Sequence, residues 1–447
     1  MGANWAGEHR KIAVVGSGIA GLSAAWLLAK RYPVTLFESD RRLGGHSNTV
    51  TVATDDGPVA VDTGFIVFNE ATYPNLVALL DHLGVPSQRS CMSFAASIAG
   101  GRTEYSSVSV NGFIGQRSNI VRPRFWSMVS DILRFYRAAP LLLKSPTAYA
   151  DTTLGEYLDT HGYNDAFIED HLLPMGAAIW STTAHEMRAY PLVAFVRFFA
   201  SHGLLELINR PQWRTISGGS ISYVVRLSDG LDIRLNSRIL GIRRHADGVD
   251  IIGTDGHVET FTDLVIATHA DTALSLLADP SDDERQVLGA FRYTDNTAVL
   301  HSDTSLMPKR RRVWASWNYV GEARDTNDTQ LCVTYWMNRL QELPTKTPLF
   351  VTLNPIRPVA EGKLHQAIAY THPLFDHAAL AAQEQLWRIQ GNRRTWFAGS
   401  YFGHGFHEDA LQSGLAAAEA LGDVERPWVE PAGACRIARA PILEAAE

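Results

Sequence analysis

Residues 11–40 constrain the fold of this chain more than any other stretch. They read as a short buried strand (KIAVV), a glycine turn (GSGIAG), a helix (LSAAWLLAKR) and a second strand (PVTLFES). Gly16, Gly18 and Gly21 have the G-x-G-x-x-G spacing where a strand passes into a helix, the context in which this spacing predicts dinucleotide binding. Glu38 ends the second strand, where an acidic side chain accepts hydrogen bonds from ribose hydroxyls. We therefore expect a dinucleotide-binding unit here.

The parts of this turn have different tasks. Gly16 makes the turn, Gly18 lets backbone approach a pyrophosphate, and Gly21 lets the helix lie close on the sheet. The helix N-terminus, at Ile19 and Ala20, points free N–H groups and a partial positive charge at the phosphates. Ser39, next to Glu38, completes the predicted ribose site.

The residues after Glu38 decide between NAD and FAD, which share this fingerprint. The stretch SDRRLGGH resembles the E-x-x-x-R-x-G-G-R continuation of the flavin amine oxidase and phytoene desaturase superfamily. The match includes Arg42, Gly44 and Gly45, while His46 stands where the superfamily usually has arginine. Adjacent glycines let backbone pass under a flat ring or a phosphate, and Arg42 adds a fixed cation. The resemblance implies FAD as the cofactor, with these residues among its contacts.

A second glycine-containing segment follows a predicted hairpin. Residues 50–69 read as two alternating strands around the turn Asp55–Gly57. In the resembling families this segment brings backbone under the isoalloxazine ring, which implies that role for Asp62, Thr63, Gly64 and Phe65. A plain hairpin end is the alternative.

The middle of the chain resembles the middle of a flavin-binding domain. A strand, a three-stranded meander and a further buried strand are expected between residues 231 and 266. The resemblance implies that Ile239 lies against adenine and that Ala267 and Thr268 approach the dinucleotide. His269 takes the place where relatives often have proline.

The last strand and helix resemble the C-terminal A-G-x-x…G-A-x-x-S-G motif of flavin oxidoreductases. A helix expected from near Glu408 would point its N-terminus at the pyrimidine edge of the flavin, where negative charge develops on reduction. Gly399 and Ser400 then belong to the cofactor site, and Asp409 and Ala410 are expected to offer backbone N–H groups. Ser400 departs from the motif, which usually has an acidic residue there.

Three histidines flank the flavin by motif and are the candidate catalytic bases: His269, His404 and His407. Unperturbed imidazole titrates near neutral pH, so it can take a proton from a substrate. Each of them alone is more often structural.

Composition excludes several classes of protein. The chain has 447 residues, 46% hydrophobic and 19% charged, as expected of a globular protein with two or three cores. A net charge of −7 argues against a nucleic-acid binder. The three cysteines are far apart, with no metal or redox spacing. No export signal and no apolar run of membrane-spanning length is present, so a cytoplasmic location is expected.

These patterns predict an α/β fold with two domains. A discontinuous, doubly wound FAD-binding domain would comprise residues 1–75, 214–290 and 391–425, and an α+β substrate domain residues 76–213 and 291–390. The last 22 residues, 426–447, read as a tail. Ligand chemistry then lies between the domains, at the carboxyl ends of the parallel strands.

Two stretches of the substrate domain allow opposite interpretations. Residues 122–144 mix Arg122, Arg124, Arg134 and Arg137 with aromatic residues, which suits a helix in a bilayer interface, although such a helix more often covers its own core. The aromatic residues between Trp314 and Trp336 fit either an apolar pocket facing a flavin or a core. The run Lys309–Arg312 is either a solvated turn or a site for lipid phosphate.

The resemblance extends to function. Residues 372–414 with 307–320 are similar to a bacterial group of FAD-dependent amine oxidoreductases that is associated with cyclopropane-synthase-like lipid methyltransferases. Some members desaturate membrane acyl chains, which implies hydride removal from an acyl C–H bond, a lipid or other apolar substrate, and a lipid methyltransferase as partner. The alternatives are a double-bond isomerase, an amine oxidase and a non-catalytic flavoprotein. Association with a membrane surface stays open.

Overall fold

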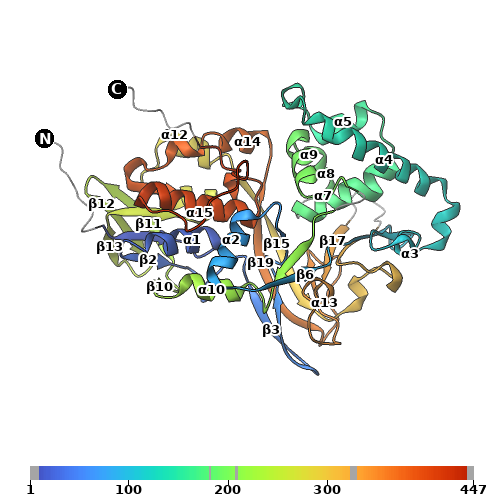
Figure 1. Ribbon diagram of the computed structural model, residues 1–447, viewed down its shortest axis with the longest axis horizontal. Coiled ribbons are helices and arrows are strands. Elements are labelled where there is room, and N and C mark those ends of the chain that lie inside the picture. The colour runs from blue at the N-terminus through green and yellow to red at the C-terminus, as the bar shows by residue number, and fades with distance from the viewer. Residues whose placement is uncertain (1–9, 181–182, 207–209, 323–329, 440–447) are drawn as a thin grey trace.

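The computed structural model describes residues 10–180, 183–206, 210–322 and 330–439. It has two lobes (Figure 1), one with α1 (Ile19–Leu28) and α15 (His407–Gly422), the other with α4 (Pro123–Leu142) and α9 (Leu192–Ser201). The long antiparallel strands β15 (Arg292–His301) and β19 (Leu364–Leu374) lie between the lobes.

A parallel sheet forms the centre of the first lobe. Its strands run in the order β10-β2-β1-β14-β20, with Ile12 of β1 paired to Val34 on one side and to Asp263 on the other. The three middle strands are buried along their whole length, which is why their sequences are nearly continuous apolar runs. The strands are β1 (Ile12–Val15), β2 (Val34–Phe37), β10 (Asp232–Arg234), β14 (Asp263–Ile266) and β20 (Thr395–Phe397).

Helices α1 and α15 pack against each other on this sheet. Gly414 allows them to approach closely, because any side chain there would clash: a Cβ on Gly414 would lie 2.2 Å from the Ala20 carbonyl oxygen. The other helices around the sheet are α2 (Pro74–Leu83), α10 (Ile221–Ser228), α11 (Ala270–Leu276), α12 (Asp282–Leu288) and α14 (His377–Gln383). Helix α2 ends at Gly84, whose φ of 64° is the left-handed conformation that favours glycine at a helix end.

The predicted hairpin and meander are confirmed. Strands β3 (Thr49–Thr54) and β4 (Gly57–Asp62) pair antiparallel, as do the successive strands β11 (Ile239–His245), β12 (Gly248–Gly253) and β13 (Val258–Phe261). A small sheet of β5 (Phe68–Asn69), β9 (Trp213–Ile216) and β6 (Ser87–Ser90) connects the lobes.

A mixed sheet forms the floor of the second lobe, in the order β19-β15-β18-β17-β16-β7-β8. Its aromatic residues pack on one another: the Trp317 and Tyr335 rings are 5.3 Å apart, and those of Trp314 and Trp336 are 5.6 Å apart. Of the two interpretations of these strands, the structure supports the core. The remaining strands are β7 (Phe94–Ile98), β8 (Thr103–Ser106), β16 (Trp317–Glu322), β17 (Gln330–Trp336) and β18 (Phe350–Leu353).

Helix α4 covers its own core, and two of the four arginines in residues 122–144 are held in ion pairs. Phe125 is buried, Arg124 pairs with Asp170 at 2.9 Å, and Arg134 pairs with Asp131 at 3.1 Å. The structure therefore supports the core interpretation of this helix, and the contact of its exposed residues, such as Trp126, with a membrane stays a prediction. The other helices of this lobe are α3 (Val110–Phe113), α5 (Leu154–Thr160), α6 (Asp165–Phe167), α7 (Leu173–Trp180), α8 (Ala184–Arg188) and α13 (Met337–Leu340).

The α/β fold class is confirmed, with a parallel sheet built from three separate visits of the chain. The residue boundaries of the domains stay a prediction. Helix α2 packs in the core of the first lobe through Leu76, Leu79 and Leu80, so its end is a better boundary than residue 75. Among the described residues, we find no helix with the length and apolar character that a bilayer span requires.

Candidate active site

The turn between β1 and α1 leaves room at one glycine only. A Cβ on Gly16, whose φ is 100°, would lie 2.7 Å from the Ala267 carbonyl oxygen, and one on Gly21 would lie 1.8 Å from the Gly16 carbonyl oxygen. A Cβ on Gly18 would meet no atom of the described chain within 4 Å. The first and third glycines therefore serve the fold, while the second keeps open the approach to the N-terminus of α1.

The carboxylate of Glu38 lies across this turn from the end of β2. It accepts hydrogen bonds from the Ser17 N–H at 2.9 Å and hydroxyl at 2.5 Å, and from the Ser39 hydroxyl and the Asp40 N–H. Arg42 lies 3.4 Å from Asp40. The first turn, the predicted ribose acid and the predicted cation are thus brought to one edge of the sheet.

The loop Gly44–His46 lies directly on the glycine turn. Gly44 donates its N–H to the Ser17 carbonyl at 3.0 Å, and a Cβ on Gly45 would come within 3.1 Å of the Gly18 Cα. The predicted segment Thr63–Phe65 lies on the same loop, because Phe65 donates its N–H to the His46 carbonyl at 2.8 Å. Three glycine-containing segments, the first turn, the loop Gly44–His46 and Thr63–Phe65, therefore meet near Gly18.

The predicted contacts beyond this loop are also close by. Ala267 donates its N–H to the Val15 carbonyl, and the Thr268 side chain lies 3.5 Å from the position of a Gly16 Cβ. Ile239 is buried at the start of β11. Ile19 and Ala20 are buried in the first turn of α1, which has no side-chain cap, so its free N–H groups remain for a ligand.

The start of α15 needs one correction. The Ala410 N–H donates to the Phe406 carbonyl at 3.2 Å and is therefore not free, since it makes the first hydrogen bond of the helix. Free N–H groups belong to the three residues before it, Asp409 included. The Asp409 carboxylate accepts from the Phe406 N–H and pairs with Arg436 at 3.2 Å. Gly399 is tied to α15 by its N–H, which donates to the Ser413 hydroxyl, and Ser400 follows it.

Four aromatic rings form a cluster near the C-terminal end of β19. The His46 ring stacks on Tyr370 at 4.8 Å and lies 5.3 Å from His372 and 6.4 Å from His269. His269 in turn stacks on Tyr293 at 4.3 Å. Tyr370 and His372 were not predicted as site residues, although their spacing of two places both on one face of a strand. We call His46, His269, Tyr370 and His372 the histidine cluster.

The histidine cluster is neutral at pH 7. Burial lowers the pKa of His269, and it lowers the pKa of His372 to about 4, with the neighbouring His269 adding to the effect. Burial, followed by the neighbouring histidines and Arg42, holds the pKa of His46 well below its usual range. The His46 Nε2 is buried and has no hydrogen-bond partner within the described residues. A buried polar atom without a partner costs free energy, which fits a site completed by a ligand.

The other two candidate bases lie near the start of α15 and differ from each other. His407 stacks on Phe65 at 3.8 Å, its Nε2 is 2.8 Å from the Tyr223 hydroxyl, and burial lowers its pKa to about 3. His407 is therefore a poor base and acts as part of a stack. His404 is half-buried, and burial lowers its pKa as well.

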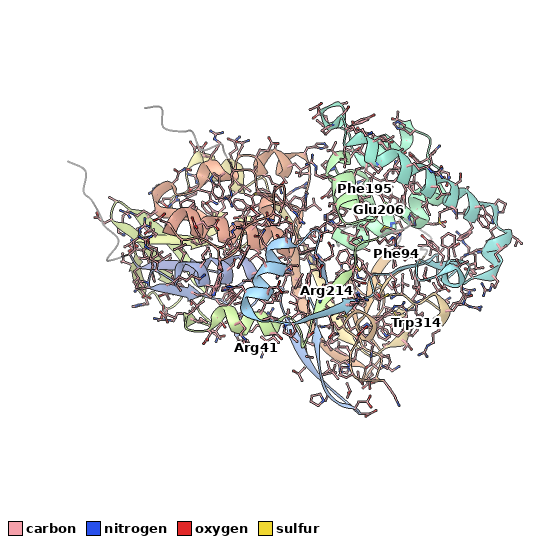
Figure 2. All side chains as sticks on the ribbon, viewed as in Figure 1. Arg41, Phe94, Phe195, Glu206, Arg214 and Trp314 are labelled. Carbon is pink, nitrogen blue, oxygen red and sulfur yellow. The ribbon has the colours of Figure 1, made fainter. Side chains whose placement is uncertain are left out.

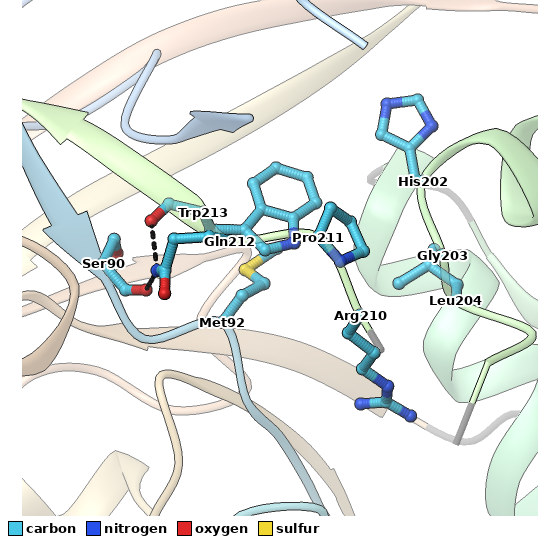
Figure 3. Close-up of a pocket in the computed structure, with 9 residues that line it drawn as sticks. All are labelled: Ser90, Met92, His202, Gly203, Leu204, Arg210, Pro211, Gln212 and Trp213. Carbon is cyan, nitrogen blue, oxygen red and sulfur yellow. Dashed lines mark hydrogen bonds between the residues drawn. The ribbon is translucent and has the colours of Figure 1, made fainter. Parts of the chain in front are cut away.

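A cavity of about 220 Å³ opens beside the link between the lobes (Figure 3). Met92, Leu204, Pro211 and Trp213 give it apolar walls. The polar residues that line it are Ser90, Arg210, Gln212 and His202.

One stack of rings connects this cavity with the start of α15. Trp213 lies 6.1 Å from His202, His202 stacks on Phe198 at 3.9 Å, and Phe198 stacks on Phe406 at 4.7 Å. Phe406 directly precedes α15. The cavity and the helix N-terminus predicted to face the flavin thus share one aromatic wall.

Comparison with known proteins agrees with this geometry. The model of the flavin-containing amine oxidoreductase family matches residues 19–339, well over half of the chain. The chain belongs to this family. It is a flavin-dependent oxidoreductase, and its cofactor is FAD. The open Gly18, the uncapped start of α1 and Glu38 form a set of donors and acceptors that fits the pyrophosphate and ribose of that cofactor.

Two solved structures share the fold at low identity. Cyclohexylamine oxidase from Brevibacterium oxydans aligns with a TM-score of 0.66 and 15% identity over 93% of this chain and 99% of that one. A fatty acid isomerase from P. acnes, described as producing CLA, aligns with a TM-score of 0.63 and 16% identity over 93% of this chain and 98% of that one. A carotenoid phi-ring synthase from Streptomyces griseus is 45% identical over 80 residues, which cover 17% of this chain and 15% of that protein.

Glu38→Gln should weaken FAD binding and leave the fold intact. An amide keeps one oxygen for the Ser17 N–H but loses the charge that ribose hydroxyls would contact, a loss of about 1 to 3 kcal/mol. Titration of the apoprotein with FAD measures this, and Glu259→Gln, a surface partner of Lys11, is the matched control. Equal affinities in the two variants would contradict the ribose role.

Proposed function

We propose that this oxidoreductase removes hydrogen from an unactivated or allylic C–H bond of an acyl chain, in a membrane lipid or a fatty acid, and leaves a double bond. The observation that carries this proposal is the aromatic wall from Trp213 to Phe406, which joins a cavity with both apolar and polar walls to the N-terminus of α15. An apolar chain has no hydrogen bonds to satisfy, so a wall of rings suits it. The fatty acid isomerase among the structural neighbours gives supporting context.

The chain's own residues provide for the proton. FAD, when bound, accepts two electrons and one hydrogen as hydride, so the second hydrogen must leave as a proton. A neutral imidazole can take it, and His269 is neutral at pH 7 because burial lowers its pKa. His269 was predicted as a base and lies in this cluster, with its Nδ1 3.1 Å from the Thr371 hydroxyl.

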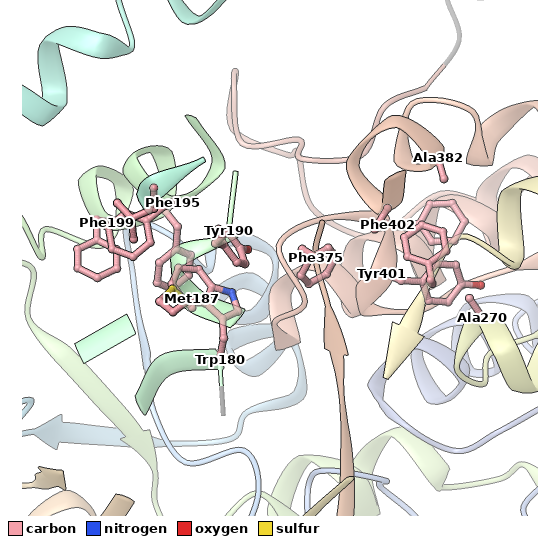
Figure 4. Packing of buried hydrophobic residues seen from close by; sticks show 14 of the residues in the cluster. Trp180, Met187, Tyr190, Phe195, Phe199, Ala270, Phe375, Ala382, Tyr401 and Phe402 are labelled. Atoms are coloured by element: carbon pink, nitrogen blue, oxygen red, sulfur yellow. The ribbon is translucent and has the colours of Figure 1, made fainter. Parts of the chain in front are cut away.

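An amine oxidase is expected to have an aromatic pair at the flavin face and a lysine near the flavin. The candidates for both features in this chain support that activity less. Tyr401 and Phe402, the aromatic residues next to the C-terminal motif, are buried in the core with Phe291 and Ala382 (Figure 4). Lys309 donates its backbone N–H to Glu104 on β8, in the second lobe and far in sequence from the histidine cluster. The two rings thus serve the core, and the Lys309 backbone is tied to the second lobe.

Anaerobic single-turnover reactions test the proposal. We expect the FAD-loaded protein to lose its yellow colour with monounsaturated phospholipid vesicles or fatty acids and to keep it with simple amines. The lipid product should be lighter by two hydrogens, since the chain is oxidised as FAD is reduced. His269→Gln should slow the reaction about 100-fold or more at unchanged FAD content. His257→Gln, an exposed position, is the control.

Other outcomes would replace the proposal by a named alternative. An unchanged lipid mass with a displaced double bond would indicate an isomerase, and rapid bleaching by an amine would indicate an amine oxidase. If lipid changes only when a lipid methyltransferase is present, and FAD stays oxidised, the protein is a flavoprotein partner of that enzyme.

A further inference from the structure

The second lobe carries exposed apolar side chains in one short segment, residues 110–126, which we call the tip. The exposed fraction is 79% for Val110, 44% for Ile120, 80% for Val121 and 49% for Trp126. They come from three successive elements, α3, the 3₁₀ turn η1 (Arg117–Val121) and the start of α4. Helix α3 lies at the outer edge of the second lobe in Figure 1. Exposed apolar side chains gathered in this way mark an interaction surface.

The tip is held in place by the core beneath it. Trp126 donates its ring N–H to the Ile120 carbonyl at 2.8 Å, so the exposed indole and the exposed turn are joined. Phe113 and Phe125 lie 5.2 Å apart, and Phe125 contacts Trp126 at 5.8 Å. The apolar side chains are therefore presented by a fixed scaffold, not by a loose loop.

A run of cations lies beside these apolar side chains. The run Lys309–Arg312 lies beside the tip, because a Cβ on Gly115 would come within 2.6 Å of Val313 and one on Gly112 within 3.7 Å of the Arg312 carbonyl. The ring of Trp314, which lies against the Arg311 guanidinium, is in the second lobe (Figure 2). Arg41, labelled in the same figure, is in the first lobe and thus apart from these cations. In the described part of the chain, these cations have no carboxylate within ion-pair distance: Arg102, Arg117, Lys309, Arg311 and Arg312.

Acidic residues do not offset this charge. Between residues 99 and 130 the sequence has one acid, Glu104, and between 304 and 321 it has none. Glu104 is buried and is used by Arg310, at 2.7 Å, and by the Lys309 N–H. The chain as a whole has a net charge of −7, so this local excess of cations is opposite in sign to the charge of the whole chain.

We propose that the tip is a docking surface for a bilayer with anionic lipids. Val110, Val121 and Trp126 would enter the interface, and the surrounding Arg and Lys side chains would contact lipid phosphate. Tryptophan at the level of the head groups and arginine beside it are the side chains that such an interface favours. The benefit of docking rests on the proposed function, since an acyl substrate is held in a membrane.

Flotation with vesicles tests docking without turnover. We expect the FAD-loaded protein to float with vesicles of phosphatidylcholine and phosphatidylglycerol and much less with phosphatidylcholine alone. The double variant Arg311→Gln/Arg312→Gln should bind about 25-fold more weakly, fivefold for each basic residue near the surface. Val110→Ser/Val121→Ser should also lose binding, and neither pair is expected to unfold because all four side chains are exposed.

Matched controls change equal chemistry elsewhere. Leu240→Ser/Val429→Ser removes two exposed apolar side chains outside the tip, and Arg243→Gln/Arg388→Gln removes two exposed cations. Both should float like the wild type. The proposal is overturned if the wild type stays with the free protein, or if tip variants and controls bind equally.

The outcomes separate docking from the chemical step. A protein that floats but leaves every lipid unchanged contradicts the proposed function and not the docking surface. A protein that oxidises dispersed fatty acid but never floats contradicts the docking surface alone. If the wild type does not bind vesicles, and the tip variants instead lose binding to a protein partner, the tip is a protein interface and the membrane proposal is wrong.

Discussion

Gly18→Ala should remove FAD from the protein without unfolding it. Gly18 has φ −61° and ψ 174°, which alanine adopts without strain, and its Cβ would meet no described atom of the chain within 4 Å. The new methyl group would instead fill the approach to the N-terminus of α1, where a pyrophosphate must lie against backbone. We expect FAD affinity to fall by about 100-fold or more, which corresponds to roughly 2.7 kcal/mol.

The matched variant is Gly21→Ala, three residues further along. Its Cβ would lie 1.8 Å from the Gly16 carbonyl oxygen, so this protein should fail to fold or lose several degrees of thermal stability even without FAD. Circular dichroism of the two apoproteins and titration with FAD distinguish the effects. If Gly18→Ala binds FAD like the wild type, the glycine turn does not hold the pyrophosphate.

Acid should unfold this protein at unusually mild pH. Burial lowers the pKa of His171 and of His202 to about 3, and that of His301 to about 4. In the unfolded chain these imidazoles titrate near 6.5. Between pH 6.5 and the folded pKa values the unfolded state therefore binds more protons, and the free energy of unfolding decreases as the pH is lowered. Each loses about 2 kcal/mol between pH 7 and pH 5, about 6 kcal/mol together.

One buried carboxyl group acts in the opposite direction. Burial raises the pKa of Asp62 to about 6, so the folded state binds its proton first and gains about 1 kcal/mol by pH 5. For these three histidines and Asp62 together the net loss is about 4 to 5 kcal/mol, a large share of the stability of an ordinary domain. The denaturant midpoint measured at pH 7, 6 and 5 with saturating FAD gives this slope.

The slope should fall when a responsible imidazole is removed. His301 lies between the Thr352 hydroxyl, 2.7 Å from its Nε2, and the Asp303 N–H, which donates to its Nδ1. His301→Gln keeps a polar side chain but removes the proton-binding group, so it should make the midpoint less dependent on pH, whereas the exposed His257→Gln should not. A midpoint that is constant from pH 7 to pH 5 would contradict this account.

The sequence alone determined the parts of this protein that depend on neighbours in the chain. The strand–turn–helix at 11–40 is such a part, because Gly21 packs on the Gly16 carbonyl five residues earlier, although Gly16 itself also packs against the distant Ala267. The end of α2 at Gly84 and the hairpin at Asp55–Gly57 are others, since a left-handed residue and a tight turn each need particular local residue types. FAD followed from the same local motifs.

The tertiary structure decided everything that depends on distant segments meeting. Asp170 neutralises Arg124 from 46 residues away, which turns an apparently basic helix face into a core cover. His46, His269 and His372 come from a loop, a helix start and a strand, and no spacing in the sequence announces their contact. Ala410 was predicted to offer a free N–H group. It lies one residue too far along α15, where the N–H already donates to the Phe406 carbonyl. Side-chain charge, exposure and proton affinity depend on what folding places beside each group, and residue types and their spacing do not encode that locally.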